Sequence, residues 1–309
     1  MAITAAMVKE LRETTGAGML DCKKALEECA GDMAKSVEFL REKGLAKAAK
    51  KAGRIAAEGL VSTAVTADGK KAVVVEVNSE TDFVAKNEDF IKFVGDVTAQ
   101  ALATGAADID AFLAEAWSLD ASKTVKEALS EKIAVIGENL NIRRFAQVTE
   151  ENGFVANYIH AAGRIGVLVQ VETTKASEAV KAAARNVAMQ IAAITPLYVD
   201  SSEVSADYIA KEKEILKQQA INENPGKPEA IIEKMIGGRL QKQLKEVCLL
   251  DQTYVKDSEL TVAKYLESVA KAEGTTIKVV KFVRFETGEG IEKVEENFAE
   301  EVAKQMGLN

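Results

Sequence analysis

The scarcity of imidazole limits the covalent chemistry that this sequence could perform. His160 is the only histidine in 309 residues. Histidine-pair metal sites are therefore excluded, and a serine or cysteine triad would have one possible base. Paired acids such as Glu286 and Glu289 could act as general acid and base, although surface charges are the simpler interpretation. The composition favours a binding protein over an enzyme, with no metal and no cofactor.

The cysteines indicate neither a disulfide framework nor a zinc module. Cys22, Cys29 and Cys248 are odd in number and lack paired C-x-x-C spacing. We expect Cys22 and Cys29 to be buried in a helical core. A reducing compartment suits free thiols, and the sequence shows no leader pattern and no apolar run of about 18 residues. A cytoplasmic protein without membrane contact is the expectation.

Charge and hydrophobicity point to a globular protein that does not bind nucleic acid directly. The net charge is -8 and the hydrophobic content is 47%. Binders of nucleic acid usually present a basic surface to phosphates, which an acidic chain does not favour. The length allows two or more packed units.

Three short amphipathic helices are predicted for the first fifty residues. Thr4 is placed to cap the first helix, and the glycines Gly16 and Gly18 supply the turn to the second. Asp32 can cap the third helix, and Gly44 is its predicted end.

Residues 45–54 are rich in alanine and lysine and are predicted to form a helical linker. A solvated connector is one interpretation. The other is a basic patch for phosphates that uses Lys47, Lys50, Lys51 and Arg54. Salt-dependent RNA binding by the chain alone would favour the second interpretation.

An internal duplication follows the linker. Residues 59–78 align without gaps to residues 153–172, with Gly59 matching Gly153. Both segments alternate apolar and polar residues on either side of a glycine-bearing turn, which is typical of a β-hairpin. A helix follows each hairpin, so the sequence predicts two related α+β units in tandem.

The two copies differ between the hairpin and the helix. Matching residues 97–100 with residues 187–190 requires four additional residues in the first copy, and their natural place is 81–84. A loop added to a rigid scaffold is a common location for function.

A projecting helical hairpin is predicted within residues 201–246. Helices at 205–222 and 229–245 flank a segment with two of the chain's three prolines, which cannot continue a helix. A strand at 276–285 and a terminal helix at 291–305 follow. The residues predicted to face one another across the hairpin are Tyr208, Ile215 and Gln219 on one arm and Ile232, Met235, Ile236 and Leu240 on the other.

Four stretches of the sequence resemble the elongation factor Ts family. They are residues 8–26, 81–86, 136–144 and 282–293, in the family's order. The resemblance implies an α+β protein with an N-terminal UBA-like three-helix domain, two related subdomains, an inserted helical hairpin and a C-terminal strand-helix module. The implied boundaries are 1–54 (UBA-like domain and linker), 55–150 (core N-subdomain), 151–200 and 247–290 (core C-subdomain), 201–246 (hairpin) and 291–309 (C-terminal helical module).

The resemblance also implies a function and a partner. The family binds elongation factor Tu in its GDP form and promotes GDP release without covalent chemistry. Phe83 is similar to the phenylalanine that the family inserts near the Mg²⁺ site of the GTPase, with Asp82 beside it. The hairpin dimerises some members of the family, so a homodimer is possible.

The resemblance assigns two sets of site residues. Other interpretations of single residues stay open: a core position for Phe83 or Leu20, an N-terminal helix cap for Asp82, a left-handed C-cap for Gly137, and a plain surface residue for His160. The loop expected to displace Mg²⁺ is Thr81, Asp82, Phe83 and Val84, and the residues expected to contact elongation factor Tu are Lys9, Arg12, Met19, Leu20, Asp82, Phe83, Ile136, Gly137 and His160.

Overall fold

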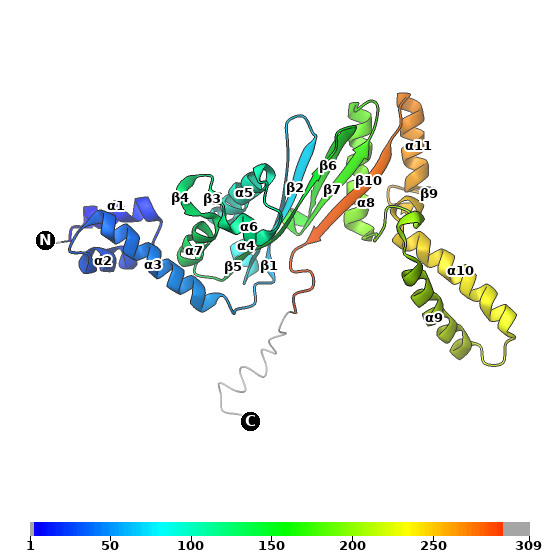
Figure 1. The fold of residues 1–309 in the computed structure, drawn as a ribbon, viewed down its shortest axis with the longest axis horizontal. Helices are drawn as coiled ribbons and strands as arrows, with labels where there is room; N and C mark the ends of the chain where they lie inside the picture. Colours follow the sequence, from blue (N-terminus) through cyan, green and yellow to red (C-terminus); the bar gives the residue numbers. More distant parts are fainter. Residues whose placement is uncertain (1–2, 293–309) are drawn as a thin grey trace. The chain divides into compact units, whose positions relative to one another are not determined.

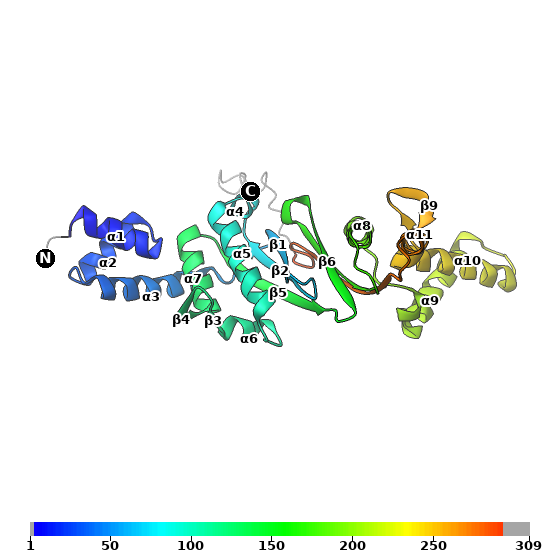
Figure 2. The same ribbon diagram turned by 90° about the horizontal axis from the view of Figure 1, so that it is seen from above.

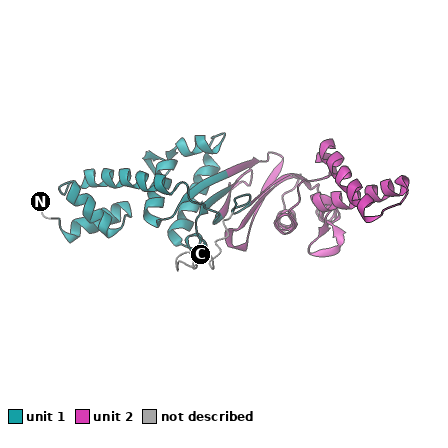
Figure 3. Ribbon diagram, turned by 90° about the horizontal axis from the view of Figure 1, so that it is seen from below, with its two compact units in different colours: residues 1–60, 75–144, 286–309 teal, residues 61–74, 145–285 magenta. Residues whose placement is uncertain are grey.

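The computed structural model describes residues 3–292 and contains both helices and strands, in agreement with the predicted α+β class. Two compact units are distinguished in Figure 3: residues 1–60, 75–144 and 286–309 in one, and residues 61–74 and 145–285 in the other. The predicted terminal helix at 291–305 lies outside the described residues except at its first two positions.

Strands β1, β2 and β5 begin in one unit and end in the other. They form a three-stranded sheet in the order β1-β2-β5. Their bounds are β1 (Glu58–Val65), β2 (Lys71–Ser79) and β5 (Leu140–Thr149). The remaining elements of the first unit are α1 (Ala5–Thr15), α2 (Met19–Glu28), α3 (Met33–Lys51), α4 (Asp82–Ala85), α5 (Glu88–Ala103), α6 (Ile109–Ala114), β3 (Ala116–Trp117), β4 (Asp120–Thr124) and α7 (Val125–Ile136).

The second unit contains another three-stranded sheet, in the order β10-β7-β6. Strands β6 and β7 pair in antiparallel register from Gly153 opposite Glu172 to His160 opposite Ile165, which confirms the predicted hairpin. The elements are β6 (Gly153–His160), η1 (Ala161–Gly163), β7 (Ile165–Glu172), α8 (Glu178–Ile194), η2 (Ser201–Glu203), α9 (Ala206–Glu223), α10 (Glu229–Val247), η3 (Leu249–Asp251), β8 (Thr253–Tyr254), β9 (Asp257–Thr261), α11 (Val262–Glu273) and β10 (Lys278–Glu286).

The N-terminal helices begin where the sequence predicted. The Thr4 hydroxyl accepts a hydrogen bond from the Met7 N–H, and the Asp32 carboxylate accepts one from the Lys35 N–H at 3.1 Å. Such side chains satisfy N–H groups that have no partner inside the helix. Cys22 is buried among α1 to α3 as predicted, whereas the prediction for Cys29 is wrong, since it is only half-buried at the C-cap of α2.

Helix α3 does not end at Gly44, which corrects our prediction. It continues to Lys51, so the predicted linker helix is the last part of α3. The alanines and lysines after Gly44 are strong helix formers, and they outweigh the roughly 1 kcal/mol that one glycine costs. Gly44 is buried, and a Cβ there would lie 3.5 Å from the Cβ of Ala134 in α7.

The duplication is longer than the sequence alignment showed. After the long helix of each copy comes a short antiparallel hairpin, then a helix, then the third strand of the sheet. The short hairpins β3-β4 and β8-β9 have the same register, including a shift after their first residue. We call residues 58–149 the first copy and residues 153–286 the second copy.

A glutamine near the end of the long helix holds the short hairpin in each copy. The Gln100 amide donates to the Ala116 carbonyl at 2.9 Å and accepts from the Ser118 N–H at 2.9 Å. Gln190 does the same in the second copy, at 3.0 Å to Thr253 and 2.8 Å from Val255. The glutamines that anchored the sequence alignment are therefore equivalent in space as well.

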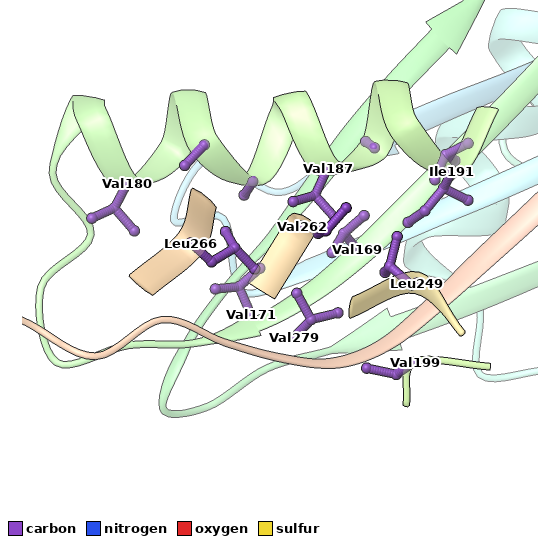
Figure 4. Packing of buried hydrophobic residues seen from close by; sticks show 14 of the residues in the cluster. Val169, Val171, Val180, Val187, Ile191, Val199, Leu249, Val262, Leu266 and Val279 are labelled. Carbon is purple, nitrogen blue, oxygen red and sulfur yellow. The ribbon is translucent and has the colours of Figure 1, made fainter. Parts of the chain in front are cut away.

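The core of the second unit lies under α8. Figure 4 shows Val180, Val187 and Ile191 of this helix pointing toward strand and helix residues that include Val169 and Val262. All five are fully buried. This packing holds the long helix, which the sequence predicted after the hairpin, against β6 and β7.

Helices α9 and α10 lie side by side in both Figure 1 and Figure 2 and form the predicted helical hairpin. Their contact includes Ile232 and Ile236, as expected. For Ile215 and Gln219 of the first arm the prediction is wrong, because both are exposed and the next residues along, Leu216 and Ala220, pack into the hairpin. In this part of α9, the face that packs into the hairpin is therefore shifted by one residue from the face that we predicted. A parallel bridge between Tyr198 and Cys248 joins the two ends of the insertion.

A buried carboxylate gathers three segments of the first unit. Glu76 in β2 is fully buried, and its oxygens accept from Arg143 at 3.0 Å and Arg144 at 2.5 Å, both in β5. They also accept from the Gly288 N–H at 2.8 Å and from Asn78 at 3.0 Å. Paired, hydrogen-bonded charge is the condition under which a buried carboxylate is tolerated.

Candidate partner-binding site

The segment added to the first copy is a one-turn helix that exposes an aromatic side chain. Helix α4 follows Thr81, whose hydroxyl lies 3.4 Å from the Val84 N–H that donates to it. Phe83 is 80% exposed, so its interpretation as a core residue is wrong. The interpretation of Asp82 as the N-cap is also wrong, because Thr81 occupies that position.

Asp82 and Lys86 form an ion pair on the open side of α4. The Lys86 amine donates to the Asp82 carboxylate at 2.7 Å and lies 5.9 Å from the centre of the Phe83 ring. The hydrogen bond from Lys86 lowers the pKa of Asp82, and the ammonium charge acts in the same direction. Both partners are exposed, so the pair contributes little to stability.

The end of α7 forms a turn that belongs to the same region. Gly137 has a φ of 88°, and its N–H donates to the Ile133 carbonyl at 2.9 Å. This confirms the left-handed C-cap, a conformation that glycine adopts without the steric cost of a Cβ. Ile136 is half-buried and Gly137 is exposed.

Residues 80–81 and 138–139 exchange hydrogen bonds, and we call this pair of segments the junction. The Glu138 carboxylate accepts from the Thr81 N–H at 3.0 Å and from the Thr81 hydroxyl at 2.7 Å. In return, the Glu80 carboxylate accepts from the Asn139 N–H at 2.5 Å. The junction brings the α4 segment and the α7 turn, which the sequence predicted as separate contact regions, into direct contact.

The C-terminal end of α3 also bonds to the junction. The Lys51 amine donates to the Gly137 carbonyl, and the Asn139 amide donates to the Arg54 carbonyl at 2.7 Å. The Arg54 guanidinium lies 3.5 Å from Glu80. Together with the 2.8 Å ion pair of Lys47 to Asp21, these contacts use three of the four cations that the phosphate-patch interpretation required. They favour a structural role for this basic segment.

The N-terminal candidates are exposed on α1 and α2. Met19 and Leu20 are 57% and 84% exposed, so the core interpretation of Leu20 is wrong. Lys9 and Arg12 are exposed as well, and Lys9 lies 3.7 Å from Glu13. The two apolar side chains are free to contact a partner.

His160 belongs to the second unit. It is the exposed last residue of β6 in the second unit, and its Nδ1 lies 3.0 Å from the Tyr158 hydroxyl. Thr81 to Val84 and the Ile136–Gly137 turn come together in the first unit. None of the hydrogen bonds of the junction described above involves His160.

Of the two acids considered for catalysis, Glu289 uses its carboxylate in an ion pair, and the contact of Glu286 with Arg144 is made by its backbone. Glu289 pairs with Arg144 at 3.1 Å, and the Glu286 carbonyl accepts from the same guanidinium at 3.3 Å. Within residues 3–292, no three side chains of the metal-binding types gather in one place. Over the same range, no helix combines the length and the apolar character needed to cross a membrane.

Sequence reasoning did not identify Glu80, Glu138 and Asn139 as parts of the site. Glu138 and Asn139 directly follow the predicted Gly137 cap, and Glu80 directly precedes the predicted loop. Their position next to predicted site residues was the only indication of their role in the sequence. It could not show that the Glu138 carboxylate bonds to the Thr81 N–H and the Glu80 carboxylate to the Asn139 N–H.

The comparisons with known proteins agree on one family. The sequence model of the family described as Elongation factor TS matches residues 80–289. Elongation factor Ts of Clostridioides difficile (strain 630) is 60% identical over 304 residues, covering 98% of this chain and 99% of the relative. Elongation factor Ts of Clostridium botulinum (strain Alaska E43 / Type E3) is 57% identical over 305 residues, covering 99% of both chains. That of Clostridium novyi (strain NT) is 55% identical over 304 residues, covering 98% and 99%.

Proposed function

The chain belongs to the elongation factor Ts family, and from this premise we propose that it binds the GDP form of elongation factor Tu and promotes GDP release. GTP can then occupy the emptied site. The exchange requires no bond to be made or broken by this chain, and it takes place in the cytoplasm.

The observation that carries the proposal is the exposure of Phe83 on an anchored one-turn helix. Nucleotides in GTPases are held by phosphate-binding backbone, Mg²⁺ and switch segments. A binding protein can loosen them only if it has higher affinity for a GTPase conformation that lacks those contacts. An aromatic side chain that becomes buried in such a conformation supplies that difference in affinity.

The other exposed candidates provide affinity rather than discrimination between conformations. Met19 and Leu20 offer apolar area for docking, and the Ile136–Gly137 turn lies beside α4 through the junction. We place His160 on a separate contact, since it belongs to the other unit.

Release of fluorescently labelled GDP from elongation factor Tu tests the proposal. The unaltered chain accelerates release at micromolar concentrations, and Phe83→Ala reduces that acceleration by about 30-fold, as expected for a buried aromatic hot spot of about 2 kcal/mol. Leu119→Ala is the matched control, because Leu119 is also apolar and 63% exposed in the first unit but lies in the β3-β4 turn. No acceleration by the unaltered chain would refute the function, and full activity of Phe83→Ala would refute the role of Phe83.

A further inference from the structure

Helix α4 is too short to hold its own position. It has four residues, none of them buried. Helices of this length are unstable in isolation, because nucleation fixes several residues for a single hydrogen bond. What orients Phe83 must therefore come from contacts at the ends of the helix.

We propose that Glu138 is the positioning residue for Phe83, which rests on the function proposed above. Its two carboxylate oxygens bind two donors of one residue, the Thr81 N–H at 3.0 Å and the Thr81 hydroxyl at 2.7 Å. Hydrogen bonds to a charged acceptor are about twice as strong as neutral ones. Glu138 thereby fixes both the backbone and the side chain of the residue that starts α4.

The direction of the hydroxyl proton gives this contact a further effect. A threonine hydroxyl has one proton and two lone pairs. With the proton directed to Glu138, the lone pairs of the Thr81 oxygen are left for the Val84 N–H, which lies 3.4 Å away. Glu138 thus selects the rotation of the hydroxyl in which Thr81 can cap α4.

Glu138 is itself held on a firm support. It follows the Gly137 cap of α7, a helix whose face of Val125, Leu129 and Ile133 is buried. Lys51 donates to the Gly137 carbonyl on one side, and the Asn139 side chain bonds to the Arg54 carbonyl on the other. The orientation of Phe83 therefore depends on α7 and α3, the helices that hold Glu138 in place.

This arrangement lowers the cost of the step in which Phe83 becomes buried in the partner. An exposed side chain on a mobile loop loses conformational entropy when a partner orders it. Glu138 orders the segment beforehand, so removing its carboxylate weakens the step that depends on Phe83 while leaving other contacts intact.

Hydrogen exchange on the full chain, without any partner, measures the ordering directly. Glu138→Ala accelerates exchange of the Thr81 and Val84 amides by about tenfold, and Glu138→Gln has a smaller effect because one oxygen can still accept from Thr81. Exchange in α5 stays unchanged. Glu131→Ala is the matched control, since Glu131 is another carboxylate of α7, bonded to Lys123 at 2.6 Å instead of α4.

A double-mutant cycle then links the ordering to function. At a saturating concentration of this chain, Glu138→Ala slows GDP release by about tenfold when Phe83 is present. The same substitution slows release by less than about twofold when Phe83→Ala is also present. The concentration that gives half the maximal rate changes little. Glu138→Gln restores part of the rate.

The outcomes separate the two proposals. Unchanged exchange at Thr81 and Val84 in Glu138→Ala overturns the positioning role, whatever the release assay shows. Equal effects of Glu138→Ala with and without Phe83 also overturn it, because a merely structural loss would add to the Phe83 defect. If the unaltered chain does not accelerate GDP release, the proposed function fails, and the hydrogen exchange still decides whether Glu138 holds α4.

Discussion

The first copy and the second copy share one framework and differ at two connections. Both have a sheet with the second strand in the centre, a long helix, a short hairpin clamped by a glutamine, and a second helix. Between the central strand and the long helix, the first copy has α4, whereas the second copy has residues 173–177 without helix. Between the long helix and the short hairpin, the first copy has α6 and the second has the α9-α10 hairpin. Additions at these connections leave the framework contacts unchanged.

The central strands differ in charge. Glu76 of β2 aligns with Gln170 of β7, which donates to Glu150 at 3.0 Å. Glu76 gathers two arginines and the Gly288 N–H, whereas Gln170 makes a single contact of this kind in the described region. The central strand of the first copy thus carries a buried charge, and that of the second carries a neutral amide at the same position.

Replacing Glu76 with the residue of the second copy should have the largest effect. Glu76→Gln removes the buried charge that pairs with both Arg143 and Arg144 and destabilises the chain by about 3–5 kcal/mol. Gln170→Ala, the matched control, costs about 1 kcal/mol. Urea unfolding curves measure both. Equal losses would show that the charge cluster adds nothing to the framework.

The same substitution changes the dependence of stability on pH. Burial raises the pKa of Glu76, but hydrogen bonds from Gly288, Asn78 and Arg144 outweigh it and leave the pKa below its ordinary value of 4.5. A carboxyl with a lowered pKa stabilises the fold above its unfolded pKa, and this contribution is lost as pH falls through the folded pKa. The unaltered chain should lose stability below about pH 4.5 more steeply than Glu76→Gln, and parallel curves would contradict this assignment.

The matched glycines at the start of each copy should behave alike. A Cβ on Gly59 would lie 2.2 Å from the Val77 carbonyl oxygen, and a Cβ on Gly153 would lie 1.9 Å from that of Val171. Either alanine substitution forces the strands apart and costs about 2–3 kcal/mol. Gly95→Ala is the control, since a Cβ there meets nothing within 4 Å and helix α5 gains up to about 1 kcal/mol. Thermal unfolding of the three variants tests this, and tolerance at one strand position alone would break the equivalence of the copies.

The glutamine clamps should contribute equally to the two copies. Gln100→Ala or Gln190→Ala removes a buried side-chain amide together with its two hydrogen bonds to the short hairpin, at a cost of about 2 kcal/mol in each case. Gln219→Ala on the exposed side of α9 should change stability by less than about 0.5 kcal/mol. Chemical denaturation provides the values. A clear difference between the two clamps would mean that the insertion in the second copy altered its framework.

Removal of the inserted hairpin should have the smallest effect on the remainder of the chain. Deleting residues 206–245 leaves the Tyr198–Cys248 bridge and the α8 core in place, so the stability of the remainder should change by less than about 1 kcal/mol. Circular dichroism and hydrogen exchange in α8 would show this. Global unfolding would instead make the hairpin part of the framework.

Local patterns predicted the first half of each copy and the last strand of the second copy, β10, but missed the short hairpins. The β6-β7 hairpin and α8 follow from alternation and helical spacing. Strand β4, with the sequence Asp-Ala-Ser-Lys-Thr, shows no apolar alternation, and β3 has only two residues. These elements are held by the Gln100 amide and the Trp117 contact to Phe93, which join residues distant in sequence.

The site was predictable to a similar extent. The mismatch between the copies located Phe83, and a left-handed cap was expected for Gly137. The Glu138 contact joins residues that are 57 apart in sequence, so no local pattern reveals it. The continuation of α3 through Gly44 was missed because the breaker signal was given more weight than the alanines and lysines that follow.

The bridge at Tyr198 and Cys248 has a consequence for engineering. The two ends of the insertion are hydrogen-bonded to each other, with the Leu197 N–H donating to the Val247 carbonyl at 2.9 Å. Neighbouring strands lie roughly 4.8 Å apart, so this position presents entry and exit points at a distance that many small domains can span with their own termini. A fluorescent or ligand-binding domain exchanged for residues 206–245 would need no long linkers. Its folding would be thermodynamically separable from that of the protein that carries it.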